Sequence, residues 1–546
     1  EGARVNGFSL CIKKDGQYLA EYIPVGHIRG YNFPEDVWRP ILKKALSKVT
    51  IWHNYKYDRI AMRMLGLEVH WFYDTTKLAH LVNENKPSKY SLDNCCALYG
   101  VPGKVQSLEF KALLELYGWN GIAGKEIEEY ATADAVATYK LWERLVAILK
   151  KVEPETIKYW QKIEFDNFRT VFGMEERGVT IDLDFCKEWE ERSYSAMRDI
   201  EDELGYDPGK PTNLQRVLID ELGLPAFVKP TSKTGKPSFD KDAMERYEAM
   251  LENMNNPLAE RILTHRGWKG AVTRYYAPYQ KHVHSDGRIR PSYASHGTVT
   301  GRFACSNPNL QQIPKETDKP WNGRVKECFI PTAGHELWEF DYSQLELRLG
   351  AAYGKDQKLL SIFNDPNPRD IFTEMAEELG WARQRVKTFV YSINYGAGAQ
   401  RIMDVFGCDK RQAQLYIENF YDAYPGLRRA NFWAKDRAEK QGYLEYWSGR
   451  RRHFNNRNES FKAFNSLIQG GGADMVKIVM NKVAKELPEA NLCLQVHDSL
   501  WFEVPIAQKE SIHAAIRDIM ENPFPEGDLD VILKVDAKQV GGKAKW

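Results

Sequence analysis

Two segments of the sequence end an apolar run near an aspartate, where a carboxylate could bind a divalent cation. The segment LWEFDYSQLELR at 337–348 predicts a strand that ends at Asp341 and a helix that follows it. The segment LCLQVHDSLWFEV at 492–504 predicts a β-hairpin with Asp498 at its turn. Aspartates on neighbouring strands could hold two Mg²⁺ ions about 3.5–4 Å apart, which stabilises the attacking and leaving oxygens in phosphoryl transfer. Either aspartate taken alone is more often a turn or helix-cap residue.

A third segment, WARQRVKTFVYSINYGAGAQR at 381–401, contains four basic residues and no acidic residue. Its cations and aromatic rings recur every four residues, so on a helix they form one slowly drifting stripe. The stripe consists of Arg383, Lys387, Tyr391 and Tyr395. Two cations followed by two rings would suit a triphosphate and then a flat base and sugar. The alternative is a basic amphipathic helix whose charged face is solvated.

These three segments, in this order, resemble the polymerase motifs of family A DNA polymerases, the group of bacterial DNA polymerase I and its phage relatives. DYSQLELR is similar to the first motif, R-x3-K-x7-YG to the second and QVHDSLWFEV to the third. The resemblance extends to TVTGRFACSNPNLQQIP at 298–314 and to NSLIQGGGADMVK at 465–477. It implies an α/β multidomain fold in which a ribonuclease H-like 3′–5′ exonuclease domain precedes a right-hand polymerase with palm, fingers and thumb.

The resemblance also implies roles for individual residues in adding dNTPs to a primer–template. Asp341 and Asp498 would be the catalytic carboxylates that bind two Mg²⁺ ions. Glu346, packed beneath the deoxyribose, would leave no room for a ribose 2′-hydroxyl. The implied nucleotide-binding residues are Arg383, Lys387, Tyr391, Tyr395, Glu346 and Gln344. The implied DNA-binding residues are Arg302, Asn465, Gln469, His497, Arg450 and Arg451.

Several of these assignments have a plain structural alternative. Taken alone, Asn465 and Gln469 would be helix-surface amides, and the run Arg450–Arg452 would be a solvated basic face. A contact with the DNA backbone is at least as plausible for that run, because residues 441–470 contain five basic and two acidic groups. The loop at 229–238, rich in Lys, Thr and Ser, would grip duplex DNA from the thumb or would be a flexible linker.

Three positions bear on the specificity of the chain. Ser499 stands where the third motif usually has glutamate, which predicts retained activity with an altered metal dependence. Phe372 stands where bacterial enzymes often have a phosphate-contacting histidine, which leaves more of the triphosphate to Arg383 and Lys387. Tyr391 occupies a position where the family has Phe or Tyr, and a tyrosine there predicts ready incorporation of dideoxynucleotides.

Two segments near the N-terminus, IWHNYKYD at 51–58 and YATAD at 130–134, resemble the second and third motifs of DEDDy-type proofreading exonucleases. The exonuclease residues implied are Asp58, Tyr130 and Asp134, and a complete site would use four carboxylates to hold two more Mg²⁺ ions. We expect the first motif, Asp-x-Glu, to lie upstream of Glu1 or to have been removed, so that the given sequence has an incomplete exonuclease site. The alternative is that these acids are remnants in a structural domain.

The elements that must position these residues form four expected regions. Strand-like and helical patterns alternate in 1–150, whereas helical patterns dominate most of 155–280 and 355–485. The apolar β segments near 340 and 495 could share one sheet that the intervening helices interrupt. The expected regions are an exonuclease-like domain at 1–150, a thumb at 151–285, a palm at 286–355 and 485–546, and fingers with palm-connecting helices at 356–484.

The composition excludes several classes of protein. The 546 residues include 76 basic and 75 acidic groups, which gives a net charge of +1. This balance excludes a uniformly basic protein that coats nucleic acid, but it does not exclude a local basic groove. A hydrophobic share of 43%, a mean hydropathy of −0.54 and the lack of a long apolar run predict a soluble globular protein with no membrane span. None of the eight cysteines forms a CxxC pair, so free thiols in a reducing compartment are expected rather than a zinc ribbon. We expect a monomer in the cytoplasm of a bacterial or phage-infected cell, with no processivity factor identified.

Two other functions fit parts of the sequence. One is a nuclease carried on a DNA-binding platform, and the other is a non-catalytic nucleic-acid-binding protein. Neither explains why Asp341 and Asp498 occur together with Lys387 and its stripe of cations and rings.

Overall fold

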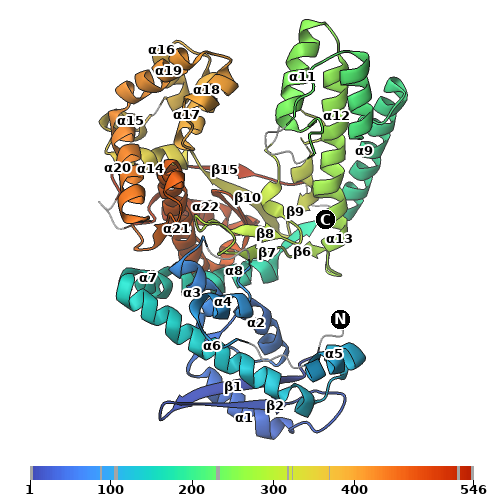
Figure 1. Ribbon diagram of the computed structural model, residues 1–546, viewed down its shortest axis with the longest axis vertical. Helices are drawn as coiled ribbons and strands as arrows, with labels where there is room; N and C mark the ends of the chain where they lie inside the picture. The colour runs from blue at the N-terminus through green and yellow to red at the C-terminus, as the bar shows by residue number, and fades with distance from the viewer. Residues whose placement is uncertain are drawn as a thin grey trace.

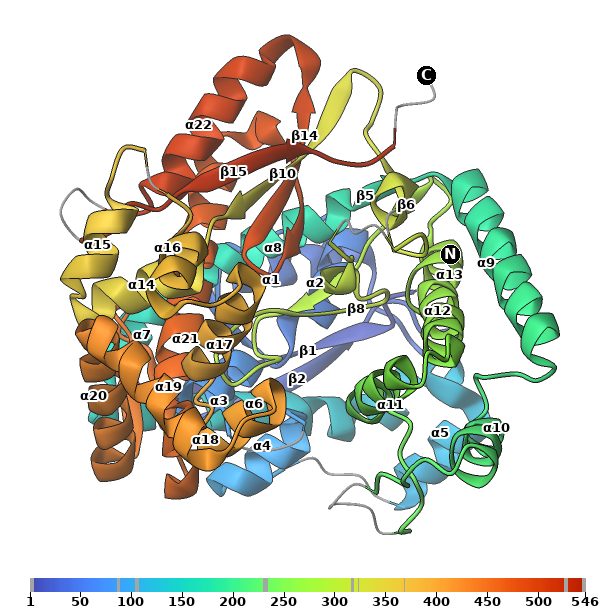
Figure 2. The same ribbon diagram turned by 90° about the horizontal axis from the view of Figure 1, so that it is seen from above.

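The computed structural model describes residues 4–85, 89–103, 108–228, 234–315, 319–322, 324–367, 369–524 and 529–542. A central antiparallel sheet lies between two helical projections, and an N-terminal unit lies below it (Figure 1). Seen from above, the two projections lie on opposite sides of the molecule (Figure 2). Among the helices of the described ranges, none is long and apolar enough to cross a membrane.

The N-terminal unit consists of two small sheets covered by helices. Its elements are β1 (Gly7–Lys14), β2 (Gln17–Pro24), α1 (Glu35–Leu46), β3 (Val49–Trp52), α2 (Tyr55–Met64), β4 (Trp71–Asp74), α3 (Thr75–Val82), α4 (Leu92–Tyr99), α5 (Leu108–Gly121) and α6 (Gly124–Val152). β1 and β2 form an antiparallel hairpin, and β3 pairs in parallel with β4. Leu141, Leu145 and Leu149, spaced by four residues on α6, are buried in a cluster with side chains of α3 and α4. This spacing is the apolar face of an amphipathic helix.

Two helices connect the N-terminal unit to the rest of the chain. α8 (Phe165–Arg177) lies beside α21 (Ala463–Glu486), and the hydroxyl of Tyr159, at the end of α7 (Pro154–Tyr159), lies 2.8 Å from the carboxylate of Asp474 on α21. The carboxylate of Glu164, between them, lies 2.6 Å from the ammonium of Lys477 on α21, and both side chains are buried. The segment between α7 and α8 is thus paired with α21, and the expected start of the thumb at residue 151 stays a prediction.

The first helical projection has its own apolar core, which includes Met244, Tyr247 and Ile262. The first half of its expected tip at 229–238, residues 229–233, lies outside the described residues. Its helices are α9 (Leu183–Leu204), α10 (Pro211–Leu214), α11 (Lys241–Asn253), α12 (Leu258–Ala271) and α13 (Ala277–His282).

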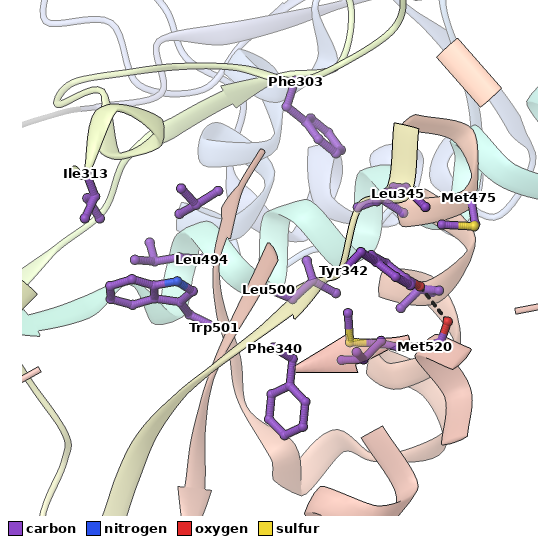
Figure 3. Close-up of a cluster of buried hydrophobic side chains, with 14 of the residues drawn as sticks. Phe303, Ile313, Phe340, Tyr342, Leu345, Met475, Leu494, Leu500, Trp501 and Met520 are labelled. Carbon is purple, nitrogen blue, oxygen red and sulfur yellow. Dashed lines mark hydrogen bonds between the residues drawn. The ribbon is translucent and has the colours of Figure 1, made fainter. Parts of the chain in front are cut away.

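The central sheet is four-stranded and antiparallel. In spatial order its strands are β13 (Leu492–Val496), β14 (Ser499–Pro505), β10 (His335–Tyr342) and β15 (Val535–Gln539). Phe340 and Tyr342 face the side covered by α22 (Lys509–Glu521), where the Tyr342 hydroxyl donates to the carbonyl of Met520 at 2.7 Å (Figure 3). The pairing of β10 with β14 confirms that the apolar segments near 340 and 495 share one sheet.

The second helical projection is inserted between β10 and β13. Its elements are α14 (Leu345–Gly354), α15 (Gln357–Phe363), α16 (Ile371–Leu379), α17 (Arg383–Asn394), α18 (Ala399–Phe406), α19 (Lys410–Ala423), α20 (Pro425–Gln441), β11 (Tyr443–Glu445) and β12 (Arg451–His453). The buried helix α21 then returns the chain to the sheet, so the sheet and this projection share one apolar core. Short strands join the first projection to the sheet: β5 (Val179–Ile181), β6 (Arg288–Ile289), β7 (Ser292–Ala294), β8 (Ala304–Ser306) and β9 (Phe329–Ile330).

Candidate functional site

Asp341 and Asp498 come from distant segments and meet through strand pairing. Asp341 is the penultimate residue of β10, where it pairs with Ser499, the first residue of β14. Asp498 immediately precedes Ser499 in the two-residue turn between β13 and β14. His497, the other turn residue, has a φ of +56°, the left-handed conformation that tight hairpin turns use. The two predicted metal-binding aspartates therefore lie together at one end of the sheet.

The surroundings of Asp341 disfavour its charged form. Burial raises the pKa of the Asp341 carboxyl to about 6; Lys315 opposes this rise, and the charges of Glu339 and Asp498 add to it. A divalent cation would relieve this repulsion, and carboxylate oxygens are ligands that Mg²⁺ accepts. The donor set at this end of the sheet therefore fits a magnesium site.

Arg302 connects Asp498 to the first turn of α14. Its guanidinium lies 3.3 Å from Oδ1 of Asp498 and 2.8 Å from Oε1 of Glu346. Glu346 is 9% exposed, and its Oε2 is a buried oxygen with no hydrogen-bond partner among the described residues. Gln344 bends the chain between β10 and α14 with a φ of +55°. We call Asp341, Asp498 and Glu346 the acidic site.

The predicted stripe runs along α17 toward the acidic site. Tyr391 lies within electrostatic reach of the acids: burial raises its pKa to about 12, and the carboxylates of the acidic site add to the rise. Tyr395 follows the last residue of α17 and is 48% exposed. Burial raises the pKa of its hydroxyl; the charge of Glu346 adds to this rise and that of Arg302 opposes it. Gly396, with a φ of +80°, follows the end of the helix in the left-handed conformation common after helix C-termini.

The outer end of the stripe is occupied by an ion pair. The Arg383 guanidinium makes two hydrogen bonds to Asp370, at 2.7 and 2.9 Å, and these hold the pKa of the Asp370 carboxyl down to about 2. Phe372 is buried beneath the stripe, with its ring centroid 5.9 Å from that of Tyr391. The cations of Arg383 and Lys387 lie 5.8 and 6.0 Å from the same ring. The Phe372 ring thus packs against the stripe at the position where bacterial enzymes often have a phosphate-contacting histidine.

The predicted DNA-binding residues divide into two groups. Gln469 on α21 acts to lower the pKa of the Glu346 carboxyl and of the Tyr395 hydroxyl, against the rise that burial causes, so it belongs to the surroundings of the acidic site. His497 is adjacent to Asp498, and burial lowers the pKa of its imidazole. Asn465, one turn before Gln469, has a buried Oδ1 with no hydrogen-bond partner in the described part of the chain. Their contacts with DNA stay predictions.

Arg450 does not lie on a DNA-facing surface. It is 2% exposed, its Nε donates to Asp474 at 3.1 Å, and it donates to the carbonyl of Thr300 at 2.8 Å. The DNA contact predicted for Arg450 is therefore wrong, because its guanidinium is buried and fully engaged inside the protein. Arg451 donates to the carbonyl of Val152 at 3.0 Å, and its contact with DNA stays a prediction.

Sequence reasoning missed several charged groups around the site. Asp370 caps α16 and binds Arg383, which no local pattern indicates. Lys326 and Lys315 come from segments before β10 and act on Asp341 only through the fold. Glu339 could have been found, because side chains alternate along a strand and Glu339 lies two residues before Asp341.

The predicted exonuclease residues come from two helices of the N-terminal unit. Asp58 lies on α2, where burial and the neighbouring Asp74 raise the pKa of its carboxyl to about 7. Tyr130 and Asp134 lie one turn apart on α6, and the Tyr130 ring stacks on Phe110 with centroids 4.7 Å apart. Asp74, which the sequence did not single out, accepts hydrogen bonds from backbone N–H groups at the start of α3. A shared catalytic role for these residues stays a prediction.

Comparisons with known proteins agree with this architecture. A family model described as DNA polymerase family A matches residues 183–545, and one described as a predicted 3′–5′ exonuclease related to the exonuclease domain of PolB matches residues 69–189. The thermostable DNA polymerase I of Thermus filiformis is 32% identical over 453 residues, which are 78% of this chain and 52% of that protein. DNA polymerase I of Rhizobium leguminosarum is 27% identical over 592 residues, 98% of this chain and 57% of that protein. The chain thus spans about half the length of the curated relatives it matches.

A solved structure covers nearly the whole chain. It is the POL domain of Pol1 from M. smegmatis in complex with DNA primer-template and dNTP, with a TM-score of 0.81 and 26% sequence identity. The match covers 96% of this chain and 90% of that one. The likeness therefore includes the N-terminal unit as well as the sheet and both projections.

Proposed function

This chain belongs to DNA polymerase family A, and from this premise we propose that it is a template-directed DNA polymerase that adds dNTPs to a primer 3′ end by two-metal phosphoryl transfer. The observation that carries the proposal is the pairing of Asp341 with Ser499, by which Asp341 and Asp498 share one end of the sheet. The stripe of α17 and the buried carboxylate of Glu346 border the same end. We propose that the first projection is the thumb, the central sheet the palm and the second projection the fingers.

The proposed chemistry divides between the acidic site and α17. Asp341 and Asp498 would hold two Mg²⁺ ions, which when bound supply a lowered pKa for the primer 3′-hydroxyl and charge for the leaving pyrophosphate. Arg302 keeps Asp498 oriented through its hydrogen bond of 3.3 Å. Arg383 and Lys387 would bind the phosphates of the incoming nucleotide, for which Arg383 must exchange Asp370 for a phosphate oxygen. Closure of α17 over the nucleotide would couple base fit to this exchange.

The proposed specificity rests on side chains around the nucleotide sugar and the base pair. Glu346 would exclude a ribose 2′-hydroxyl, and Tyr391 would permit dideoxynucleotides. Gln344 would complete the nucleotide pocket. Arg302, Asn465, Gln469 and His497 would contact the primer–template, where minor-groove acceptors common to all Watson–Crick pairs test base-pair shape without reading sequence.

A second function, 3′–5′ proofreading, is favoured by the exonuclease-related match over residues 69–189. Tyr130 and Asp134 lie inside the matched range, and Asp58 lies before it. We propose that these residues belong to a site of the DEDDy type, in which Tyr130 would orient the attacking water. Primer shortening on a mismatched primer, with Mg²⁺ and no dNTP, tests this activity in a longer chain that includes the Asp-x-Glu motif; an unchanged primer would count against it.

The experiment for the main proposal is primer extension on one labelled template with dNTPs and, separately, with rNTPs. We expect extension with dNTPs to the end of the template and little extension with rNTPs. Binding of the primer–template with no extension would favour the non-catalytic binding protein, and degradation without extension would favour the nuclease.

A further inference from the structure

Glu339 lies on the face of β10 that carries Asp341. Side chains alternate across a strand, so residues 339 and 341 point to one side and Trp338 and Phe340 to the other. The side of β10 that carries Trp338 and Phe340 packs on α22, because the rings of these two residues contact His513 of that helix. The strand register pairs Glu339 with Trp501 and Asp341 with Ser499.

Both oxygens of Glu339 are engaged by groups at the acidic site. Oε1 lies 3.2 Å from the Ser499 hydroxyl, which also lies 2.9 Å from the carbonyl of Val496, and Oε2 lies 2.5 Å from the ammonium of Lys326. Ser499 directly follows Asp498, so one short side chain connects Glu339 to the turn that carries Asp498. The Glu339 and Lys326 side chains are only 15% and 12% exposed, which keeps this arrangement largely out of solvent.

From this geometry we propose that Glu339 is a third carboxylate beside Asp341 and Asp498, tethered by Ser499, and that it strengthens divalent-cation binding at that end of the sheet. The proposal rests on the proposed function of the acidic site. Glu339 acts as a positioning and charge-supplying residue: it adds negative charge beside the two aspartates, while Lys326 balances that charge when no cation is bound.

The position of Ser499 supports this assignment over a simple Glu339–Lys326 ion pair. An ion pair alone needs no contact with the turn after Asp498, yet Glu339 lies within hydrogen-bond distance of the Ser499 hydroxyl, which can donate its one proton to Glu339 or to the carbonyl of Val496. Ser499 also stands where the resembling motif usually has glutamate. Glu339 on β10 therefore supplies a carboxylate next to position 499, where β14 itself has only a serine.

The test measures Mn²⁺ binding to the full chain without DNA, by electron paramagnetic resonance of the free ion, together with the Mg²⁺ dependence of primer extension. Glu339→Gln keeps the size of the side chain and removes its charge. We expect Mn²⁺ affinity to fall roughly 10-fold and the Mg²⁺ concentration for half-maximal extension to rise in parallel. The double variant Glu339→Gln with Ser499→Glu should restore most of the affinity, because the charge returns from β14.

The matched control is Glu336→Gln, a glutamate on the opposite face of β10 that accepts from Trp338. Its Mn²⁺ affinity should equal that of the unchanged chain. Glu339→Gln with unchanged Mn²⁺ affinity and only a lowered melting temperature would overturn the proposal and leave a structural ion pair. A chain that binds no Mn²⁺ and extends no primer before any substitution would instead overturn the proposed function, so the two failures are distinguishable.

Discussion

Glu346 is the side chain whose removal should change sugar selection most. It is 9% exposed, and Arg302 holds one of its oxygens at 2.8 Å. Glu346→Ala opens space beneath the sugar, so we expect the preference for dNTP over rNTP to fall by roughly 10- to 100-fold. The measurement is kcat/KM for a matched dNTP and rNTP on one template. Glu346→Gln keeps the volume and should keep most of the preference; an unchanged ratio in the alanine variant would contradict this role.

At the residue scale, the sequence predicted those site residues that a local pattern of apolar, charged and aromatic residues marks. Asp341 and Asp498 follow apolar runs that end in a turn, and the α17 stripe follows from helical spacing, so these residues were found without the fold. Arg450 was misassigned because composition does not report burial: its guanidinium is engaged by Asp474, a residue no local rule pairs with it. Asp370 was missed for the same reason.

The junction of α16 and α17 gives a prediction at the scale of elements. Asp370 both caps α16 and holds Arg383, and asparagine caps helices about as well as aspartate. Asp370→Asn should therefore release Arg383 without unfolding the helix. Because the pair is half exposed, we expect a modest fall in KM for dNTP, about 2- to 5-fold, that shrinks as salt is added.

The control for this change is Glu377→Gln, which removes a partner of Arg369 on the exposed side of α16. Steady-state dNTP titrations at low and high ionic strength measure the effect. An unchanged or raised KM in Asp370→Asn would show that the ion pair helps rather than competes with nucleotide binding.

The segment from Ser292 to Arg302, which is β7 and the loop that follows it, is held by the N-terminal unit. Three side chains of that unit donate to its carbonyl groups: Lys56 to Tyr293 at 2.9 Å, Lys77 to Ser295 at 2.7 Å and His80 to Thr298 at 3.0 Å. The loop ends at Arg302, which orients Asp498 and Glu346. Side chains of the exonuclease-related domain should therefore affect polymerisation.

Lys77→Met tests this connection, because methionine fills the buried space and loses the donor, while Lys477 still pairs with Glu164. We expect kcat for primer extension to fall about 3- to 10-fold with KM for dNTP little changed. Lys482→Met is the control, since Lys482 donates to the carbonyl of Pro523, away from this loop. Unchanged kcat with only a lowered melting temperature would mean that the contact serves stability alone.

At this scale, hydrophobic pattern predicted the hairpin at Asp498, the strand at Asp341 and the insertion between them. It did not predict that the segment between α7 and α8 packs against α21. A helical period shows that a helix has a buried face but not which element covers that face; here the buried Glu164 is paired with Lys477 of α21.

Across the whole molecule, the expected order of an exonuclease-related domain before a polymerase fold is confirmed. His453 joins these parts: its Nδ1 lies 2.9 Å from Glu84 and its Nε2 lies 2.8 Å from Glu153. Burial alone would lower the pKa of His453, but its hydrogen bonds to Glu153 and Glu84 raise it to about 9 from an ordinary 6.5. The charged imidazole therefore stabilises the junction between the N-terminal unit and β12.

The pH dependence follows from the sign of this shift. A raised pKa in the folded state means that the stabilisation is complete below pH 6.5 and is lost as pH rises through about 9. The difference in melting temperature between the unchanged chain and His453→Gln should be largest near pH 6 and shrink toward pH 10. Thermal unfolding over this range measures it, and a difference that is constant with pH would contradict a charged bridge.

The central claim is that Asp341 and Asp498 form the catalytic end of a DNA polymerase palm. Its most direct measurement is single-turnover primer extension by Asp498→Ala, paired with primer–template affinity from fluorescence anisotropy and with Asp422→Ala, an exposed aspartate of the second projection, as control. The account predicts that extension falls roughly 10³-fold or more in Asp498→Ala while DNA affinity stays within about threefold. Extension that persists in Asp498→Ala at the rate of the Asp422→Ala control would contradict it.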